Sequence, residues 1–223
     1  MAYGIQLLGG SNQYAITDSY KNPQLALKST ATTVTEPTFD NASRLSITYT
    51  RTSTSDSVLC FLGNTTGLTG FIGTSESGND VTWTYFTDMA VGTVIDYYIF
   101  SDAVVPTADT YGIHIYNAAG TRTFSSAGKP LRLTSVSTRS ISWSTSVNLT
   151  YTTGRSYAVA QVGYADATRY VIMGDVTWVF TGGCKVITDG INIGTIQYAT
   201  SAGDGTGFDY NIMRYLVCDV TGY

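Results

Sequence analysis

The sequence predicts an all-β protein made of two tandem β-sandwich domains of the immunoglobulin-like type. The chain of 223 residues is 43% hydrophobic and only 13% charged, which excludes a disordered chain and a solvated helical bundle. β-Branched residues and tyrosines are abundant, and such side chains suit a pleated sheet. Apolar and polar residues alternate with a period of two in several short segments, and no segment has helical periodicity. A small β-barrel is the alternative architecture.

Two kinds of strand pattern are visible. Alternation predicts half-buried antiparallel strands at 44–50, 80–86 and 139–143. Continuous apolar runs at 57–62 and 157–162 instead predict central strands that are covered on both faces.

An internal repeat divides the chain into domains at 1–106 and 107–223. Each copy begins with a strand, a tight turn, a return strand and a proline-marked entry into a third strand. Blocks of similar sequence recur in the same order, which makes duplication a better explanation than chance. The matched blocks are 3–8 with 111–116, 58–63 with 158–163, 80–83 with 175–178, and 95–99 with 208–212.

The two copies differ in length at two places, which predicts one insertion near 29–43 and a second within 181–207. The short segment 87–94 closes the first copy, so the extra residues of the second copy are not needed to close the fold. Within that insertion, Ile191, Ile193 and Ile196 would form an exposed apolar strand edge. We therefore predict that these three isoleucines contact a neighbouring subunit.

The sequence offers no convincing catalytic group. A serine or cysteine nucleophile usually requires a base, and His114, the only histidine, takes the position of Gln6 in the other copy. Such a position is expected on the outer face of a strand. Cys60, Cys184 and Cys218 lack the spacing of a zinc or redox motif, so we expect buried, reduced thiols. We predict no enzyme activity and no cofactor.

The acidic residues point to structural roles. Asp80 with Asp175, and Asp96 with Asp209, recur beside Trp or Tyr, which favours turn capping or strand-end hydrogen bonds. A glycosidase that uses paired carboxylates stays open as a minor alternative. A calcium site is conceivable, but its spacing matches no EF-hand loop. Its ligands would be Asp189, Asp204 and Asp209.

Aromatic residues are the best candidates for surface recognition. Trp83 and Trp178 hold equivalent places in the repeat and are expected in the core. Tyr164, Tyr170 and Tyr198 have no counterpart in the first copy and lie near predicted loops. Exposed aromatic residues mark binding surfaces, so we predict that these three tyrosines contact a receptor or a sugar.

Charge and hydropathy restrict the partners. The net charge is -4, and lysine and arginine are scattered, so nucleic acid is not an expected partner. No apolar run approaches the roughly 18 residues of a membrane span, and we expect a soluble protein without membrane insertion. We expect the protein to be synthesised in a cytoplasm.

The hairpin motif at 111–120, with FSS at 124–126 and PLRL at 130–133, resembles uncharacterised tail proteins of bacteriophages. Those proteins carry a YGI or YGL hairpin with an N-x-x-G turn at or near the start of the chain, and the opening at 1–6 is similar. The first copy departs from the pattern, because GGSN at 9–12 replaces the Asn-to-Gly turn.

The resemblance implies a structural component of the virion tail, in the tip, baseplate or fibres, made in the cytoplasm of the bacterial host. Its expected partners are other virion proteins, copies of itself in a symmetric oligomer, and a polysaccharide or receptor on the host surface. It supplies no catalytic residue. A carbohydrate-binding module or adhesin is the main alternative, and a depolymerase is a third.

Overall fold

The structure, a computed structural model, confirms the all-β class: the residues that it describes form strands, turns and irregular segments, with no helix among them. The described residues are 4–9, 12–17, 22–37, 42–63, 66–104, 113–125, 127–142, 145–171, 176–202 and 212–223.

The strands fall on both sides of the predicted boundary between the halves. The first half contains β1 (Gly4–Gly9), β2 (Asn12–Thr17), β3 (Gln24–Thr32), β4 (Val34–Thr35), β5 (Ser43–Thr50), β6 (Val58–Gly63), β7 (Thr69–Ser77), β8 (Asp80–Thr87) and β9 (Val94–Ser101). The second half contains β10 (His114–Tyr116), β11 (Arg122–Ser125), β12 (Leu133–Ser140), β13 (Ser146–Thr150), β14 (Tyr157–Gln161), β15 (Asp166–Val171), β16 (Val176–Ile187), β17 (Gly190–Ala202) and β18 (Ile212–Asp219).

Most strands predicted from alternation or from apolar runs are confirmed. They are β5, β6, β8 and β14, and β6 and β14 are neighbours at the centre of their sheet. The predicted strand at 139–143 is only partly right, because β12 ends at Ser140. β6 is apolar throughout because both of its faces are covered: Leu62 packs between the sheets, whereas Phe61 belongs to a cluster with Tyr98 on the other face.

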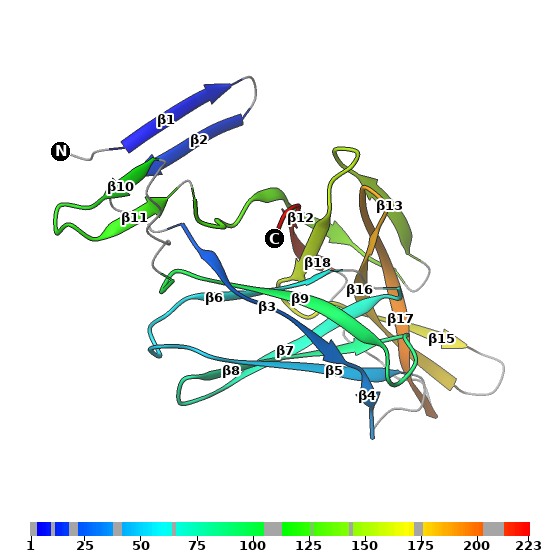
Figure 1. Ribbon diagram of the computed structural model, residues 1–223. Coiled ribbons are helices and arrows are strands. Elements are labelled where there is room, and N and C mark those ends of the chain that lie inside the picture. Colours follow the sequence, from blue (N-terminus) through cyan, green and yellow to red (C-terminus); the bar gives the residue numbers. More distant parts are fainter. Residues whose placement is uncertain are drawn as a thin grey trace.

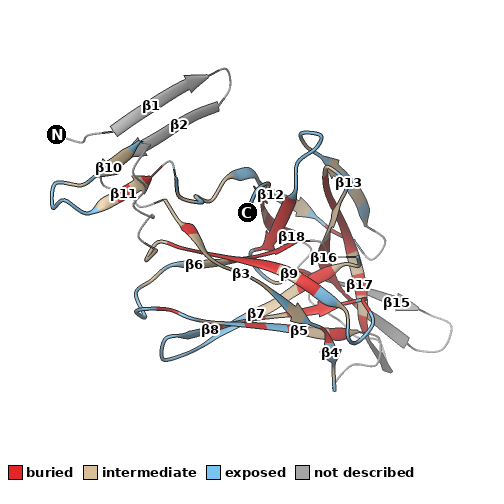
Figure 2. Ribbon diagram, viewed as in Figure 1, coloured by how far each residue is buried: buried red, intermediate tan, exposed pale blue. Residues whose placement is uncertain are grey.

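Two large antiparallel sheets form the body of the molecule (Figure 1). One has six strands in the order β12-β18-β14-β6-β9-β3. The other has eight strands: seven lie in the order β13-β17-β16-β7-β8-β5-β4, and the eighth, β15, pairs with β16 beside this path. Their inward side chains pack face to face, as in a β-sandwich. Figure 2 shows the buried segments concentrated on the strands of these two sheets.

Each half has its own core between the sheets. In the first half it includes Leu45, Trp83 and Ile99, so the predicted core position of Trp83 is confirmed. In the second half it includes Val159 and Ile193. A further cluster joins the halves across the outer face of the six-stranded sheet. Its members are Phe61, Tyr98, Phe100, Ala158, Ala160, Cys218 and Val220.

The strand order repeats in the two halves. The first half contributes β3-β9-β6 and β7-β8-β5, and the second contributes β12-β18-β14 and β16-β17-β13, in the same order along the chain. Main-chain pairing of β6 with β14 and of β7 with β16 makes both sheets continuous from one half to the other. The halves are therefore joined edge to edge, whereas separate tandem sandwiches would each have complete sheets. The predicted boundary itself lies within 105–112, outside the described residues.

Some details of the predicted repeat are wrong. The identical sequences at 80–83 and 175–178 lie at the start of β8 and of β16, whereas the strand order pairs β8 with β17. The predicted insertion at 181–207 is also misplaced, because residues 181–187 end β16 in the position that β7 occupies in the first half. The extra length includes β15 and the distal parts of β16 and β17. Trp178, Asp175 and Asp209 lie outside the residues whose side chains are described.

The predicted insertion in the first half is confirmed. Residues 33–42 join β3 to β5 and include β4, whereas only residues 141–145 join β12 to β13. β4 pairs with β5 at the edge of the eight-stranded sheet.

Two hairpins stand outside the large sheets, β1 with β2 and β10 with β11 (Figure 1). Both were predicted. In the second hairpin Gly120 takes a left-handed φ of 75°, and the Asn117 side chain accepts hydrogen bonds from the amides of Ala119 and Thr121. The N-x-x-G turn thus uses asparagine to bind the turn backbone and glycine to adopt a positive φ. The first hairpin has a shorter connection, because Gly9 pairs with Asn12.

Candidate functional site

The two halves meet along a line of pairing that we call the seam, where β6 contacts β14 and β7 contacts β16. Buried polar groups bind across it. The Thr69 hydroxyl donates to the Cys184 carbonyl oxygen at 2.9 Å, and the Phe71 amide donates to Gln161 Oε1 at 3.1 Å. Gln161 Nε2 in turn donates to the Gly163 carbonyl oxygen at 3.2 Å. The seam is therefore fixed by specific hydrogen bonds as well as by apolar contacts.

A polar hollow of about 760 Å³, the seam groove, opens where strands and loops of the two halves meet. A smaller hollow of about 440 Å³ adjoins it and shares Thr66 and Lys185. The first half supplies Thr66, Asp96 and Tyr98 to the seam groove, and the second half supplies the rest. The second-half lining is Arg155, Ser156, Tyr157, Lys185, Val186, Ile187, Thr188, Asp189 and Val220.

Charges of both signs line these hollows. Burial raises the pKa of Asp88, against the opposing effects of the hydrogen bond from the Leu68 amide and of nearby Lys185. Arg155 contacts Asp219 at 3.3 Å. Burial alone would raise the pKa of Asp219, but hydrogen bonds from Thr221 and the nearby arginines hold that pKa below its ordinary value.

Asp189 has a structural role at the edge of the groove. It has a φ of 57° in the two-residue turn between β16 and β17. Its carboxylate accepts a hydrogen bond of 2.7 Å from the Gly154 amide, and its carbonyl oxygen accepts one of 2.7 Å from the Tyr151 amide. These bonds tie the turn to the loop between β13 and β14. The groove as a whole therefore offers hydroxyl, carboxylate and ammonium groups suited to a polar, hydroxyl-rich ligand.

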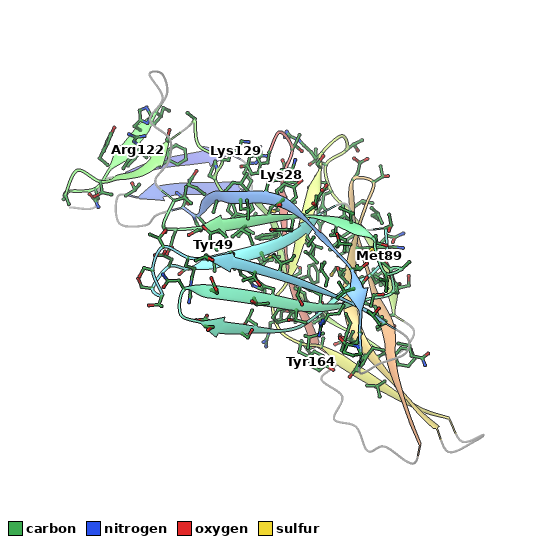
Figure 3. All side chains as sticks on the ribbon, turned by 60° about the horizontal axis from the view of Figure 1, so that its bottom comes forward. Lys28, Tyr49, Met89, Arg122, Lys129 and Tyr164 are labelled. Atoms are coloured by element: carbon green, nitrogen blue, oxygen red, sulfur yellow. The ribbon has the colours of Figure 1, made fainter. Side chains whose placement is uncertain are left out.

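Aromatic side chains gather at a second place on the seam. The Tyr198 ring stacks on Phe86 with a centroid distance of 4.7 Å, and the hydroxyls of Tyr164 and Tyr198 lie 2.8 Å apart. With Ile72 they line a shallow hollow of about 350 Å³. Figure 3 shows Tyr164 at the opposite end of the molecule from Arg122, which lies on the β10–β11 hairpin.

This aromatic cluster brings together two of the three predicted contact tyrosines. Tyr164 is half-buried, whereas Tyr198 is only 8% exposed and serves mainly to hold the cluster in place. The side chain of Tyr170 lies outside the described residues. Of Tyr164 and Tyr198, Tyr164 is the better placed to contact a ligand.

The predicted subunit-interface residues are not at the surface. Ile191 and Ile193 are fully buried, and Ile196 is 2% exposed. Ile191 and Ile193 pack in the core of the second half, because β17 is an inner strand covered by the six-stranded sheet. The expectation of an exposed apolar edge at these residues is therefore wrong, and they stabilise the fold of their own chain.

The three cysteines are free and buried, as expected. Burial raises the pKa of Cys60 and that of Cys184 to about 12. Asp80 accepts a hydrogen bond of 2.5 Å from the Thr50 hydroxyl across β5 and β8, which is the strand-end role predicted for it. Asp204, of the conceivable calcium set, lies outside the described residues.

His114 is half-buried on β10, with its ring centroid 6.5 Å from that of Tyr116. No cluster of three or more histidine, cysteine, aspartate or glutamate side chains occurs within the described part of the chain. In the same residues no helix is long and apolar enough to span a membrane.

Comparison with protein-family models, curated proteins and solved structures finds no match for this chain. The seam groove is not predicted from the sequence. Its residues, such as Thr66 and Arg155 in loops and Lys185 on β16, are single polar side chains far apart in the sequence, and only the pairing of the halves brings them together. No local sequence signal identifies such a site.

Proposed function

We propose that this chain is a structural protein of a bacteriophage tail, in its tip, baseplate or fibres. In this role it assembles with other virion proteins and copies of itself, and its loops face the host surface. Its synthesis takes place in the cytoplasm of the bacterial host.

The observation that supports this role most strongly is the separate hairpin at the start of each half. The second hairpin coincides with the sequence motif that resembles phage tail proteins, the first follows the similar opening at 1–6, and both stand outside the two sheets. A hairpin outside the sheets is available to contact other subunits. In the second hairpin, Ile113 is 55% and Tyr116 49% exposed, and Arg122 lies over the Tyr116 ring at 5.8 Å. Large exposed apolar groups near a cation are common at protein interfaces.

The proposal extends to the fold of each half, which we assign to the immunoglobulin-like class. In that class strands B, E and D are neighbours in one sheet, and strands C and F are neighbours in the other. The orders β5-β8-β7 and β6-β9 support this assignment in the first half, and β13-β17-β16 and β14-β18 support it in the second. In this assignment β3 and β12 occupy the sheet-edge position beside strand F that strand G, the last strand, occupies in the immunoglobulin fold.

The test is incorporation into particles. Tyr116→Asp should leave the protein folded, because the side chain is exposed, but should exclude the protein from assembled virions. Val91→Asp is the matched control, since Val91 is 58% exposed on the loop between β8 and β9. Equal incorporation of both variants would contradict the role assigned to the hairpin.

The seam groove and the aromatic cluster favour the second candidate, a carbohydrate-binding module or adhesin. Hydroxyl and charged groups of the groove suit a saccharide, and Tyr164 offers an aromatic surface. Lys185→Ala and Tyr164→Ala should then reduce binding to the polysaccharide of the host, measured with the purified protein. Unchanged binding in both variants would count against this candidate.

A further inference from the structure

The edge strand β12 turns polar side chains toward the core of the second half. Three of its residues pair directly with the buried core residues Val217, Tyr215 and Met213 of β18, and directly paired residues of an antiparallel sheet lie on the same face. The three inward residues are Ser135, Ser137 and Arg139. Val136, by contrast, is 69% exposed. The usual arrangement of a half-buried strand, with apolar residues inside and polar residues outside, is therefore reversed.

The first half shows that the fold does not require this reversal. β3 takes the place of β12 there, and both strands have a register shift, between Leu25 and Leu27 and between Leu133 and Ser135, which aligns them. The inward residues of β3 after the shift are Leu27, Ser29 and Ala31. Leu27 and Ala31 pack against the core of the first half, whereas Ser135 and Arg139 hold these positions in the second. Polar groups at core positions cost stability, and such departures are typical of functional sites.

The three polar residues line a hollow of about 480 Å³, the β12–β13 hollow, which opens between edge strands of the two sheets. A volume of this size holds a small ligand. The hollow shares no lining residue with the seam groove or the aromatic cluster. The residues that complete its lining are Thr138, Asn148, Leu149, Thr150, Tyr151 and Tyr215.

Arg139 is the only charged residue in this described lining. Within the part of the chain that the structure describes, its guanidinium forms no ion pair and no hydrogen bond. The hollow therefore favours an anionic ligand. A guanidinium presents paired N–H donors in a plane, which match the two oxygens of a carboxylate.

A second polar group in the lining lacks a partner. The Tyr151 hydroxyl oxygen is buried, and among the described residues it makes no hydrogen bond of ordinary geometry. Burial raises the pKa of this hydroxyl, with nearby Ser135 opposing the shift. A buried hydroxyl without a hydrogen bond costs free energy, so a ligand that bonds to it gains affinity.

We propose that the β12–β13 hollow binds an acidic sugar, a pyranose ring that carries a carboxylate. The carboxylate pairs with Arg139. The hydroxyls of Ser135, Ser137 and Tyr151 bind those of the ring, because each hydroxyl can both donate and accept a hydrogen bond. Leu149 is the one aliphatic side chain in the described lining, so a purely apolar ligand does not fit. This site is separate from the seam groove, and its role does not depend on the tail assignment.

The experiment titrates the purified full chain with methyl glucuronide and with methyl glucoside and measures binding from NMR chemical shifts. The glucuronide should bind at least about tenfold more tightly, because the two sugars differ only in the carboxylate that Arg139 binds. Arg139→Ala introduces the residue that the first half has at this position, so the fold should be retained and the preference lost. Arg214→Ala is the matched control, since Arg214 is exposed and pairs with Thr138 on the other face of the sheet.

Equal binding of the two glycosides by the wild-type chain, or binding of neither, would overturn the proposal without the need for a variant. Inorganic sulfate that binds as tightly as the glucuronide would indicate a general anion site and would overturn the sugar assignment. A loss in Arg214→Ala equal to that in Arg139→Ala would also overturn it, because net charge would then explain the effect. Lys185→Ala changes the seam groove and should leave this binding intact, so the two sites are tested separately.

Discussion

The Thr69 hydroxyl donates a 2.9 Å hydrogen bond to the Cys184 carbonyl oxygen at the register position where β7 and β16 pair. Both residues are buried, so this bond joins the two halves at a position shielded from bulk solvent. Thr69→Val keeps the side-chain shape but leaves the carbonyl oxygen without this donor. We expect the free energy of unfolding to fall by about 1–3 kcal/mol. Chemical denaturation measures this free energy. Thr69→Ser keeps the hydroxyl, so it should lower the free energy of unfolding less than Thr69→Val does.

The buried thiols predict a pH dependence of stability. Burial raises the pKa of Cys60 and of Cys184 from 9.0 to about 12. A raised folded-state pKa contributes stability that is complete below the unfolded-state pKa and is lost as pH rises toward the folded-state value. The free energy of unfolding should therefore decline between pH 9 and about 12. Cys184→Ala should make that decline less steep, and an equally steep decline would contradict the account.

The thiols should also be chemically protected. At pH 8 a thiol reagent should react with the folded protein far more slowly than with the protein in denaturant, because the reactive form is the thiolate and these thiols are buried. Fast labelling of the folded chain at Cys60 or Cys184 would show that the seam opens readily. Peptide mass spectrometry identifies the labelled cysteine.

In the aromatic cluster, Tyr198 should stabilise the fold, whereas Tyr164 should serve for ligand contact. Tyr198→Ala removes a nearly buried ring stacked on Phe86 and should cost about 3 kcal/mol of stability. Tyr198→Phe keeps the stacking and loses the hydroxyl contact with Tyr164. It should cost about 1 kcal/mol. Thermal unfolding distinguishes the two, and equal losses would contradict the structural role of the ring.

Substitutions in the turn of the second hairpin should loosen that hairpin and leave the rest of the fold unchanged. Asn117→Ala removes both side-chain hydrogen bonds to the turn amides, and Gly120→Ala strains the left-handed φ of 75°. Because the hairpin lies outside the sheets, both variants should speed amide exchange at 114–125 and leave the exchange of β6 and β14 unchanged. Slower refolding of the whole chain would show that the hairpin belongs to the folding core.

The sequence predicted the strands better than it predicted their pairing. Alternation identified β5 and β8, and the apolar runs identified β6 and β14, because burial on one face or on two leaves a local pattern. Matching 58–63 to 158–163 aligned Cys60 with Ala160, yet Cys60 packs between the sheets and Ala160 packs on the outer face. A register error of one residue reverses the faces of a strand, and short sequence matches do not exclude such an error.

The site was harder to predict than the fold. Tyr164 and Tyr198 were singled out because they have no counterpart in the first half, but nothing local indicated that Tyr198 stacks on Phe86 from the other half. The three isoleucines were misassigned for a related reason. An apolar strand in an apparent insertion resembles an exposed edge until its neighbours are known, and the neighbours of β17 are β13 and β16.

The most direct test of the tail assignment is the position of the chain in the intact virion. We predict that a cryo-EM map of the particle whose genome encodes this sequence contains density in the tail tip, baseplate or fibres that fits the two joined sheets. The hairpins should contact neighbouring subunits in that map. Density for this chain in the capsid shell, or its absence from purified particles by mass spectrometry, would contradict the assignment.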